Sequence, residues 1–415
     1  MRVLAARVLD FPFQPGRPIM DSHLAEPGAE VRPTSRGDVR VCEAKGRRLR
    51  EIFIRFPWRV YRSDPQWVPP LLVERRDFIN PHKHPFYLHG SAIPLLAFRG
   101  DEPVGRVMVS DDPNYNREHQ SNVGCFGMFE SVDDEEVARA LVDAAADWLR
   151  ARGRDRIRGP IDYSLNYTCG LLVDGFDTPP RIMMGHNPPH YERLLRACGL
   201  EKAKDLYAWW FDDSNDMLAV WGRRAERLAA RGRIQIRPLR FDDLDAEIER
   251  CKAVYNAAWE RNWGFVKMTD AEFHHLAKQL KVFAMPDLLL LAEVDGEPVG
   301  VSLTLPDFNE VIRPLNGRLF RWGLPLGLVQ LYRNRRSART ARLMVLGILQ
   351  PFRRRGVAEL LILRTLDYGK HQVRFTGAEL SWTLEDNDLI NRTIEVVGGR
   401  RYKTYRIYER PIEPK

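Results

Sequence analysis

The amino-acid sequence predicts a layered α/β (α+β) fold made of two tandem domains, each a mixed, mostly antiparallel sheet flanked by helices. Three observations support this prediction. The 415 residues exceed what one ordinary core accommodates, and 44% of them are hydrophobic, as in globular proteins. Strand patterns alternate with helical patterns along the chain. Several patterns also recur in the same order, which indicates a duplicated unit.

The clearest repeat is a predicted β-hairpin. Phe98–Val109 has the sequence FRGDEPVGRVMV, and Ala292–Thr304 has AEVDGEPVGVSLT. Both place a Gly-Asp or Asp-Gly turn before a strand that opens with Glu-Pro-Val-Gly, which is typical of a tight hairpin. Later in each half, an Asn precedes a Gly by twelve residues and brackets an amphipathic helix that leads into an aromatic-rich strand: Asn187 and Gly199 before strand 206–211, Asn387 and Gly399 before strand 402–408.

The repeated unit is predicted as strand, helical region, hairpin, strand, helix, strand, helix and strand. In the first copy these elements are 39–42, 49–61, 94–109, 123–128, 135–152, 156–159 with a long excursion to 184, 189–197 and 206–211. In the second they are 234–236, 244–259, 288–305, 343–349, 357–371, 378–384, 389–397 and 402–408. The predicted domains are therefore 38–213 and 232–415, with a polar-faced helical linker at 214–231.

Composition excludes several classes of protein. Residues 1–37 are rich in Pro, Gly and Arg and predict a disordered tail, unless Met20 is the true start. No stretch approaches the ~20 apolar residues of a membrane helix, so no membrane partner is predicted. Five cysteines without a CxxC spacing favour free thiols in a reducing cytoplasm. His82, His84 and His89 lack acidic or Cys partners at a metal-binding spacing, so solvated histidines and no metal are expected.

The sharpest motif is Arg353-Arg354-Arg355-Gly356-Val357-Ala358, which lies between an apolar strand and a helix. Glycine lets the backbone turn tightly and approach a ligand, and the first N–H groups of a helix point outward without partners. Together with the helix dipole and three arginines, they predict a site for an anion such as a pyrophosphate. The alternative is a basic turn that starts a helix. The net charge of +8 suits an anionic small ligand and also RNA, so it does not choose between them.

At this motif the chain resembles the GNAT acyltransferases, whose signature is Arg/Gln-x-x-Gly-x-Gly/Ala between a strand and a helix. The resemblance is strong in the second half and rests mainly on topology in the first. It implies acetyl-CoA or another acyl-CoA as co-substrate. It also implies that Leu346, Gly347 and Ile348 offer backbone groups to the pantetheine arm, and that the next strand splays away. Asn387 would contact the cofactor, cap the following helix, or do both.

The resemblance implies direct attack of an amine on the thioester carbonyl, which needs a base and sometimes an acid. Glu385 is the predicted base, and its alternative is a solvated carboxylate. The usual acid is a tyrosine seven residues after the asparagine, where this chain has Ile394. Tyr402, Tyr405 or Tyr408 would have to replace it, although strand alternation predicts that some of them are core residues.

The first copy is predicted not to bind coenzyme A. Its corresponding loop, 128–136, lacks the Arg and Gly residues and carries five carboxylates, which would occupy and repel a pyrophosphate site. We expect this copy to support the fold and to supply one wall of the acceptor pocket. In the second copy, Asn262 and Trp263 are predicted to line that pocket, although a core Trp is the alternative. The insert Asp307–Arg339 is predicted to form a lid.

The leading hypothesis is an acyl-CoA-dependent N-acyltransferase, acetyl by expectation, that acts on the amine of a small molecule as a cytoplasmic monomer or homodimer. A second hypothesis comes from the Fem-type transferases, which also pair two GNAT-like folds but take their acyl group from aminoacyl-tRNA. A third is a non-catalytic acyl-CoA-binding regulatory protein, which the missing tyrosine would allow. Long-chain acyl donors also remain open.

Overall fold

A computed structural model of the chain describes residues 34–36, 38–212, 233–260, 262–281 and 284–414, together with Val220, Gly222 and Arg227. All of these residues belong to one compact unit, Val31–Lys415. Most of the predicted linker and tail lie outside the described residues, but Thr34–Arg36 of the predicted tail form the strand β1.

Every element predicted for the first copy is present, with boundaries shifted by a few residues. The sequence analysis missed η1, α4, α5 and β7, because such short elements have too few turns to show a period. The elements after β1 are β2 Val39–Glu43, α2 Gly46–Arg55, α3 Pro57–Val60, α4 Leu72–Phe78, η1 Pro85–Leu88, β3 Ser91–Arg99, β4 Glu102–Asp111, α5 Pro113–His119, β5 Val123–Ser131, α6 Glu135–Arg150, β6 Arg156–Gly159, β7 Leu171–Asp174, α7 Tyr191–Ala197 and β8 Glu201–Phe211.

The elements predicted for the second copy are present as well, and the structure adds α10 and the short helices of the insert. The elements are β9 Ile234–Pro238, η2 Phe241–Asp243, α9 Leu244–Trp259, α10 Asp270–Lys281, η3 Pro286–Leu288, β10 Leu289–Val294, β11 Glu297–Pro306, α11 Phe308–Ile312, η4 Arg313–Leu315, α12 Leu326–Asn334, β12 Thr340–Ile348, η5 Gln350–Phe352, α13 Val357–Tyr368, η6 Gly369–Val373, β13 Gly377–Leu384, α14 Asp388–Val396 and β14 Arg400–Pro411. They confirm the predicted fold class, a mixed and mostly antiparallel sheet flanked by helices.

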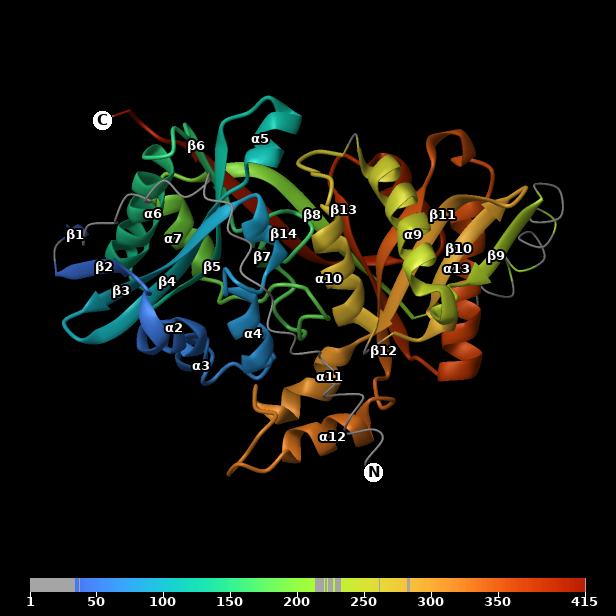
Figure 1. Cartoon of the computed structure of the whole chain (residues 1–415), viewed down its shortest axis with the longest axis horizontal. Coiled ribbons are helices and arrows are strands. Elements are labelled where there is room, and N and C mark those ends of the chain that lie inside the picture. The colour runs from blue at the N-terminus through green and yellow to red at the C-terminus, as the bar shows by residue number, and fades with distance from the viewer. Residues whose placement is uncertain are drawn as a thin grey trace, which may run out of the picture. The chain divides into compact units, whose positions relative to one another are not determined.

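The strands of both copies join one sheet, and the two copies exchange their last strands (Figure 1). The order is β1-β2-β3-β4-β5-β6-β14-β8-β13-β12-β11-β10-β9, with β7 beside β14. β14 ends the second copy but pairs with β6 of the first, whereas β8 ends the first copy and pairs with β13 of the second. β8 and β14 also pair with each other, from Trp210 opposite Arg400 to Glu201 opposite Glu409. Each half of the sheet is therefore completed by a strand of the other copy.

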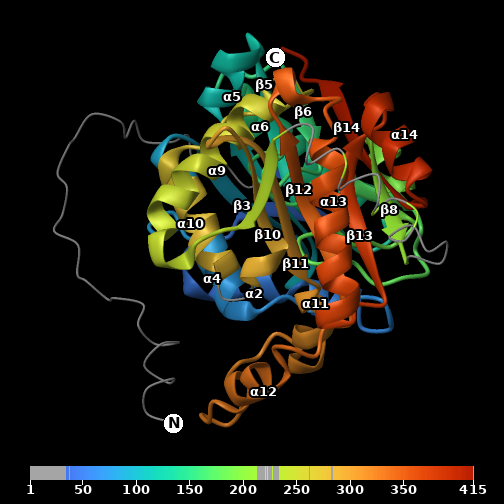
Figure 2. The ribbon, with the colours of Figure 1, turned by 90° about the vertical axis from the view of Figure 1, so that its right-hand side faces the viewer.

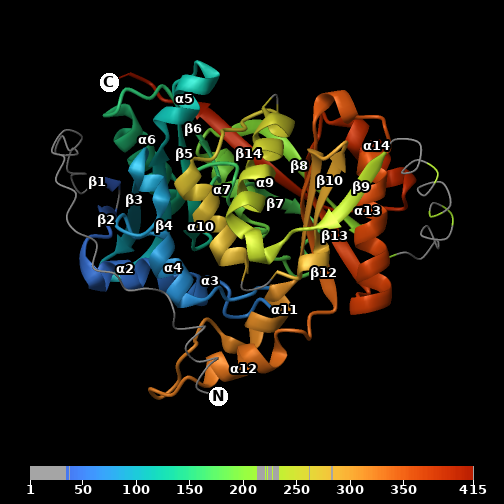
Figure 3. The same cartoon turned by 45° about the vertical axis from the view of Figure 1, so that its right-hand side comes forward.

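Helices cover both faces of the sheet in the second copy (Figures 2 and 3). α9 and α13 pack on opposite faces, as two glycines of neighbouring strands show. A Cβ atom on Gly347 would collide with the Trp259 ring of α9, at 2.2 Å, and a Cβ atom on Gly300 would meet Val357 of α13, at 2.9 Å. Because side chains alternate along a strand, these contacts separate the face that carries α9 and α10 from the face that carries α13 and α14.

Two further observations concern the cysteines and the lengths of the helices. Cys42, Cys125, Cys169, Cys198 and Cys251 are all free thiols. Among the described residues, no helix combines the length and the apolar character needed to cross a bilayer.

The exchanged strand β14 carries a lysine that is fully enclosed. Lys403 has no exposed surface, and its ammonium group donates to the backbone oxygens of Gly175, at 2.9 Å, and Thr178, at 2.6 Å. Burial lowers the pKa of Lys403 to about 8, because the charged form loses its hydration inside the protein. Lys403 thus fastens the long excursion that follows β6 onto the second copy.

We expect Lys403→Met to change how stability depends on pH. The unfolded lysine titrates near pH 10.4, so the charged native lysine lowers stability below about pH 8, and this loss disappears as the pH rises. The native protein should therefore gain about 2 kcal/mol relative to the variant between pH 8 and pH 10. Urea unfolding of both proteins at the two pH values measures this difference. A difference that does not change with pH would show that Lys403 titrates normally.

Candidate functional site

The predicted anion-binding motif lies where β12 leads into α13. Gly356 has a left-handed backbone with φ of 86°, and α13 begins at the next residue. No side chain among the described residues caps this helix end. The first N–H groups of α13 are therefore left to a ligand or to water, which is what a pyrophosphate site requires.

The three arginines of the motif differ in what they contact. Arg353 is held by the protein, because its guanidinium donates to the backbone oxygens of Ala258, at 2.8 Å, and Ile348, at 3.2 Å. It therefore links the ends of α9 and β12. Arg354 and Arg355 are exposed, and the Arg355 guanidinium lies 5.1 Å from the centre of the Phe352 ring. Arg354 and Arg355 thus remain accessible to an anionic ligand.

β12 and β13 separate beyond the point where they pair, and we call the interval between the two strands the slot. Their parallel pairing covers Thr340–Leu343 opposite Gly377–Leu380 and stops there. β12 continues to Ile348 along β11, and a bulge falls at Met344. Leu346 and Ile348 are half-buried and Gly347 is buried. The edge of β12 that faces away from β11 is thus free of strand pairing beyond Leu343, where the pantetheine arm is predicted to lie.

A polar cluster lies at the closed end of this slot, with three buried members and the half-buried Tyr402. Arg342 lies on β12 beside Glu379 on β13, and its Nε donates to the Ser381 hydroxyl at 2.8 Å. Ser381 in turn donates to Glu379 at 2.5 Å. The Tyr402 hydroxyl donates to the other oxygen of Glu379, whose side chain is fully buried. We call Arg342, Glu379, Ser381 and Tyr402 the vertex cluster, because they lie where the two strands separate.

The vertex cluster combines a carboxylate with a tyrosine that stays protonated. Burial, together with the Glu379 charge, raises the pKa of Tyr402 above its ordinary value. Burial also lowers the pKa of Arg342, while the Glu379 charge acts against that shift. A protonated hydroxyl held by a carboxylate can give a proton to a leaving group and take one back. The sequence analysis missed Glu379, because a single Glu inside an apolar strand forms no recognisable motif. Its position just before the two strands separate was the available signal.

The other predicted catalytic residues lie in different surroundings. Tyr405 is fully buried, and its hydroxyl has no hydrogen-bond partner among the described residues. Tyr408 donates to Glu192 of α7 at 3.1 Å, so it belongs to the first copy's core. Glu385 pairs with Lys202 at 2.6 Å and accepts the backbone N–H of Asp205 at 3.0 Å, which ties the end of β13 to β8. These contacts give Glu385 a structural function, and its role as base stays a prediction.

Two positions near α14 bear on the predicted cofactor contacts. Asn387 occupies the N-cap position of α14, yet its side chain makes no capping hydrogen bond. Helix capping therefore does not explain why asparagine occupies position 387, and a contact of Asn387 with the cofactor stays a prediction. Ile394 is 2% exposed and packs in the core with Leu343 and Ile362, so it takes a purely apolar place where the family has its tyrosine.

The equivalent slot of the first copy is filled by the chain itself. β5 and β6 pair in parallel only over Val123–Cys125 and Arg156–Arg158. Beyond them, Ile161 donates its N–H to the Phe126 oxygen at 2.7 Å, and the Asp162 carboxylate accepts the N–H of Met128 at 2.9 Å. Burial raises the pKa of Asp162 to about 6. Segment 160–162 thus takes the place that a pantetheine arm would need.

The start of helix α6 in the first copy is occupied as well. The Asp134 carboxylate accepts the N–H of Glu136 at 2.8 Å, and Arg99 pairs with Asp134 at 3.0 Å. The helix end that corresponds to the pyrophosphate site therefore already holds a negative charge from the protein. Both observations support the prediction that the first copy does not bind coenzyme A.

The predicted acceptor residues lie where the two copies meet. Trp263 lines a small pocket with Tyr115, Arg158 and Ser164 of the first copy. The Arg158 guanidinium lies 4.8 Å from the centre of the Trp263 ring. Asn262 takes part in the turn that ends α9, through backbone bonds to Trp259 and Phe265. The structure therefore puts Trp263 in a pocket shared by both copies, whereas it shows no pocket contact for Asn262 among the described residues.

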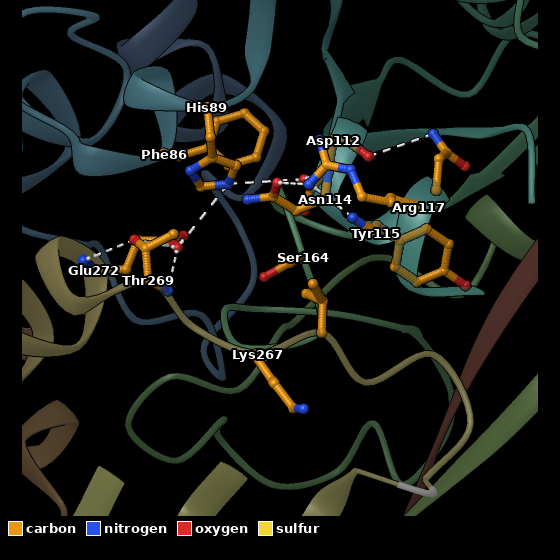
Figure 4. Close-up of polar contacts among 12 residues, drawn as sticks. Phe86, His89, Asp112, Asn114, Tyr115, Arg117, Ser164, Lys267, Thr269 and Glu272 are labelled. Carbon is orange, nitrogen blue, oxygen red and sulfur yellow. Dashed lines mark hydrogen bonds and ion pairs between the residues drawn. The ribbon is translucent and has the colours of Figure 1, made fainter. Parts of the chain in front are cut away.

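A half-buried histidine lies between two carboxylates at the same junction (Figure 4). The Nε2 atom of His89 is 3.7 Å from Asp112, which caps α5, and 4.0 Å from Glu272 of α10. Its Nδ1 atom is buried without a partner among the described residues. Burial raises the pKa of Asp112. His89 and Asp112 of the first copy thus meet Glu272 of the second and link the two copies.

One expectation about a loop is wrong. His84 and His89 are not freely solvated: His84 is 3% exposed and His89 is half-buried, and burial lowers the pKa of His84 to about 3. The local sequence was right about a loop here but could not show what packs against it. The insert exposes its apolar side chains Phe320, Trp322 and Leu324 by 57%, 89% and 56%, and its role as a lid stays a prediction. The described residues contain no group of three or more His, Cys, Asp or Glu side chains suited to a metal ion.

Comparison with solved structures identifies the same architecture. The tandem GNAT protein from the clavulanic acid biosynthesis pathway superposes with a TM-score of 0.54 at 12% identity, over 91% of this chain and 99% of that chain. The GCN5-related glucosamine N-acetyltransferase region of a fungal multi-domain GH3 β-N-acetylglucosaminidase gives 0.53 at 14% identity, over 95% of this chain and 40% of that chain. At such low identity these similarities show the fold alone.

Sequence comparison finds much nearer relatives. No family model matches the chain. The bacterial ceramide synthase of Caulobacter vibrioides is 36% identical over 366 residues, which cover 87% of this chain and 94% of that protein. Protein YghO of Escherichia coli is 34% identical over 363 residues, which cover 87% of this chain and 92% of that protein. The chain therefore belongs to the same family as these two proteins, and it has the fold of the tandem GNAT proteins.

Proposed function

We propose that the protein is an acyl-CoA-dependent N-acyltransferase in which the second copy alone binds the donor. One observation carries this proposal: the slot between the parallel strands is open in the second copy and filled by residues 160–162 in the first. The uncapped start of α13 lies at the far end of the open slot, which supports a donor that has a pyrophosphate at one end and a thioester at the other.

Particular groups would hold the donor. The N–H groups that follow Gly356 and the exposed Arg354 and Arg355 would bind the pyrophosphate. The free edge of β12 at Leu346, Gly347 and Ile348 would bind the amides of the pantetheine arm, much as a neighbouring strand would. This arrangement directs the thioester toward the vertex cluster, where β12 and β13 separate.

The vertex cluster suits the chemistry of amide formation. The amine nitrogen attacks the thioester carbonyl, a C–N bond forms, and the C–S bond breaks. The proton lost by the amine passes, directly or through water, to Glu379. Tyr402 gives its proton to the leaving thiolate and regains one from Glu379, so that the net transfer runs from amine to thiol. Arg342 stabilises the carboxylate between these steps. This route replaces the tyrosine that the family has at the position of Ile394.

The relatives narrow the proposed substrates. A ceramide is a fatty amide of a long-chain amino alcohol, and one relative is named a bacterial ceramide synthase. We therefore propose a fatty acyl-CoA as donor and a long-chain primary amine as acceptor. The sequence alone predicted an acetyl donor and a small amine, and the experiment below compares the two.

Thiol release from acyl-CoA in the presence of an amine tests the proposed function. We expect palmitoyl-CoA with sphinganine to release free thiol and to yield an amide that mass spectrometry detects. Acetyl-CoA and small polar amines should react at least about tenfold more slowly, since buried methylene groups supply much of the binding energy. If thiol is released only with acetyl-CoA and a small amine, the proposed substrates are wrong but the proposed reaction stands. No amine-dependent release with any pair would overturn the reaction itself.

Tyr402→Phe should lower kcat on the order of 100-fold while the KM for acyl-CoA changes little, because the hydroxyl acts in proton transfer and not in donor binding. Tyr408→Phe is the matched control: this tyrosine lies on the same strand, and its hydroxyl also donates to a glutamate, but at α7. The kcat of Tyr408→Phe should stay within about twofold of the native value. Equal effects of the two substitutions would remove Tyr402 from the mechanism.

Gly356→Val should abolish the thermal stabilisation by acyl-CoA, because the added side chain stands before the first N–H groups of α13. Gly296→Val controls for backbone strain. Gly296 has φ of 85°, nearly the 86° of Gly356, but it turns the β10–β11 hairpin with open space around it. Both variants should lose similar stability without ligand, whereas only Gly356→Val should lose the ligand-induced shift. A full shift in Gly356→Val would place the pyrophosphate elsewhere.

A further inference from the structure

The insert between β11 and β12 forms a projection of its own. It contains α11, η4, a tight turn and α12, and Figures 1 and 2 show α12 set away from the sheet. Its base is fixed to the first copy, because the Trp58 indole donates to the Asn316 side chain at 2.7 Å and the Leu72 N–H donates to Gly317 at 3.0 Å. The projection is therefore held in a defined position.

A tryptophan stands at the tip of the projection. Arg321 and Leu324 form an antiparallel bridge, and the two residues between them have positive φ: 51° at Trp322 and 75° at Gly323. A left-handed backbone is unfavourable for a bulky side chain, and such turns normally take Asn or Gly. The Trp322 side chain is 89% exposed, so packing within the protein does not compensate. Its position indicates a function outside the folded chain.

Other apolar side chains surround this tip. Within thirteen residues, the chain exposes Phe320 by 57%, Trp322 by 89%, Leu324 by 56%, Leu326 by 42%, Val329 by 52% and Tyr332 by 43%. α12 already packs on the segment before it, since Gly327 donates to the Leu319 oxygen at 3.0 Å. The six apolar side chains stay exposed although this contact is made. Exposed apolar side chains gathered in so short a segment, which we call the apolar patch, mark an interaction surface.

The charged side chains of this segment all have one sign. Between Val311 and Thr340 the chain has seven arginines and no Asp, Glu or Lys. Arg333 in the last turn of α12 and Arg335, Arg336 and Arg339 after it are exposed. One carboxylate lies at the end of the segment, where Glu310 accepts the backbone N–H of Arg339 at 2.7 Å. Guanidinium groups bind phosphate oxygens in pairs, so an arginine-rich segment of this kind attracts anions.

We propose that residues 318–339 dock on the surface of a bilayer that contains anionic phospholipids. Trp and Tyr prefer the interface between headgroups and acyl chains, aliphatic side chains reach just below it, and arginines pair with the phosphates. α12 has nine residues, too few to cross a bilayer. The sequence predicted no membrane partner because it lacks a spanning segment, and a segment that lies on the surface does not need one.

This surface adjoins the closed end of the open slot. The insert ends at Arg339, β12 begins at the next residue, and its pairing with β13 ends at Leu343, about 10 Å farther along the strand. The pyrophosphate motif follows the opposite end of β12. A docked bilayer would thus lie near the end where lipid substrates react and away from the coenzyme's charged end. The docking proposal does not rest on acyl transfer, because binding is measured without substrates.

Sedimentation with vesicles tests the proposal on the full chain. The native protein should sediment with phosphatidylcholine and phosphatidylglycerol vesicles mixed at about 2:1, and much less with phosphatidylcholine alone. The triple variant Phe320→Ser, Trp322→Ser, Leu326→Ser should bind the mixed vesicles at least about tenfold more weakly. Because these side chains are exposed, the variant should keep its thermal stability. The double variant Leu389→Ser, Val396→Ser removes side chains that are 56% and 61% exposed on α14 and should bind normally.

Two further measurements separate a bilayer from other partners. Tryptophan emission should shift to the blue when mixed vesicles are added, and Trp322→Phe should lose most of that shift. Light scattering without vesicles should give the same mass for the native protein and the triple variant. Failure of the native protein to bind mixed vesicles, or equal binding by the triple variant, would overturn the proposal. A dimer that the triple variant dissociates would assign the patch to a second copy of the chain instead.

Discussion

The pairing of β8 with β14 is the constraint on which the rest of the structure depends. Each strand belongs to one copy by sequence and completes the sheet of the other. This exchange places the first copy beside the slot of the second. The excursion after β6 comes to lie against the vertex cluster, where the Arg342 guanidinium donates to the Ile182 oxygen at 2.5 Å. Withdrawal of either strand would expose the edges of both halves.

The two copies show how one topology can leave a strand edge unpaired or cover it with its own chain. In both, a short parallel pair is followed by a splay. Unpaired backbone groups in a splay must find partners, because buried N–H and C=O groups without them are costly. The first copy supplies partners from residues 160–162. The second leaves the edge of β12 without a strand partner and places a buried charge pair at the closed end, where Glu379 and Arg342 neutralise each other in a medium of low polarity.

The sequence revealed the fold in most of its parts, since hairpins, amphipathic helices and the motif at Gly356 depend on neighbours in the chain. Strand exchange could not be predicted, because β8 and β14 have the same alternation whichever sheet they join. For the site, the residues proposed to bind the donor follow from a motif, whereas Glu379 and the His89 group depend on contacts between distant segments. Glu385 is predicted as a base from its place at the end of the splayed strand, yet its contacts with Lys202 and Asp205 depend on β8.

The closed slot of the first copy limits how that copy could change. A Cβ atom on Gly127 would lie 2.5 Å from the Ile161 oxygen, and one on Gly159 would lie 2.2 Å from the Phe126 oxygen. The closure is thus made by main chain against main chain and involves a glycine on each side. Replacing the Asp162 side chain would leave the obstruction in place. A point mutation would therefore not open the slot of the first copy, because only a different course of the whole loop would remove the obstruction.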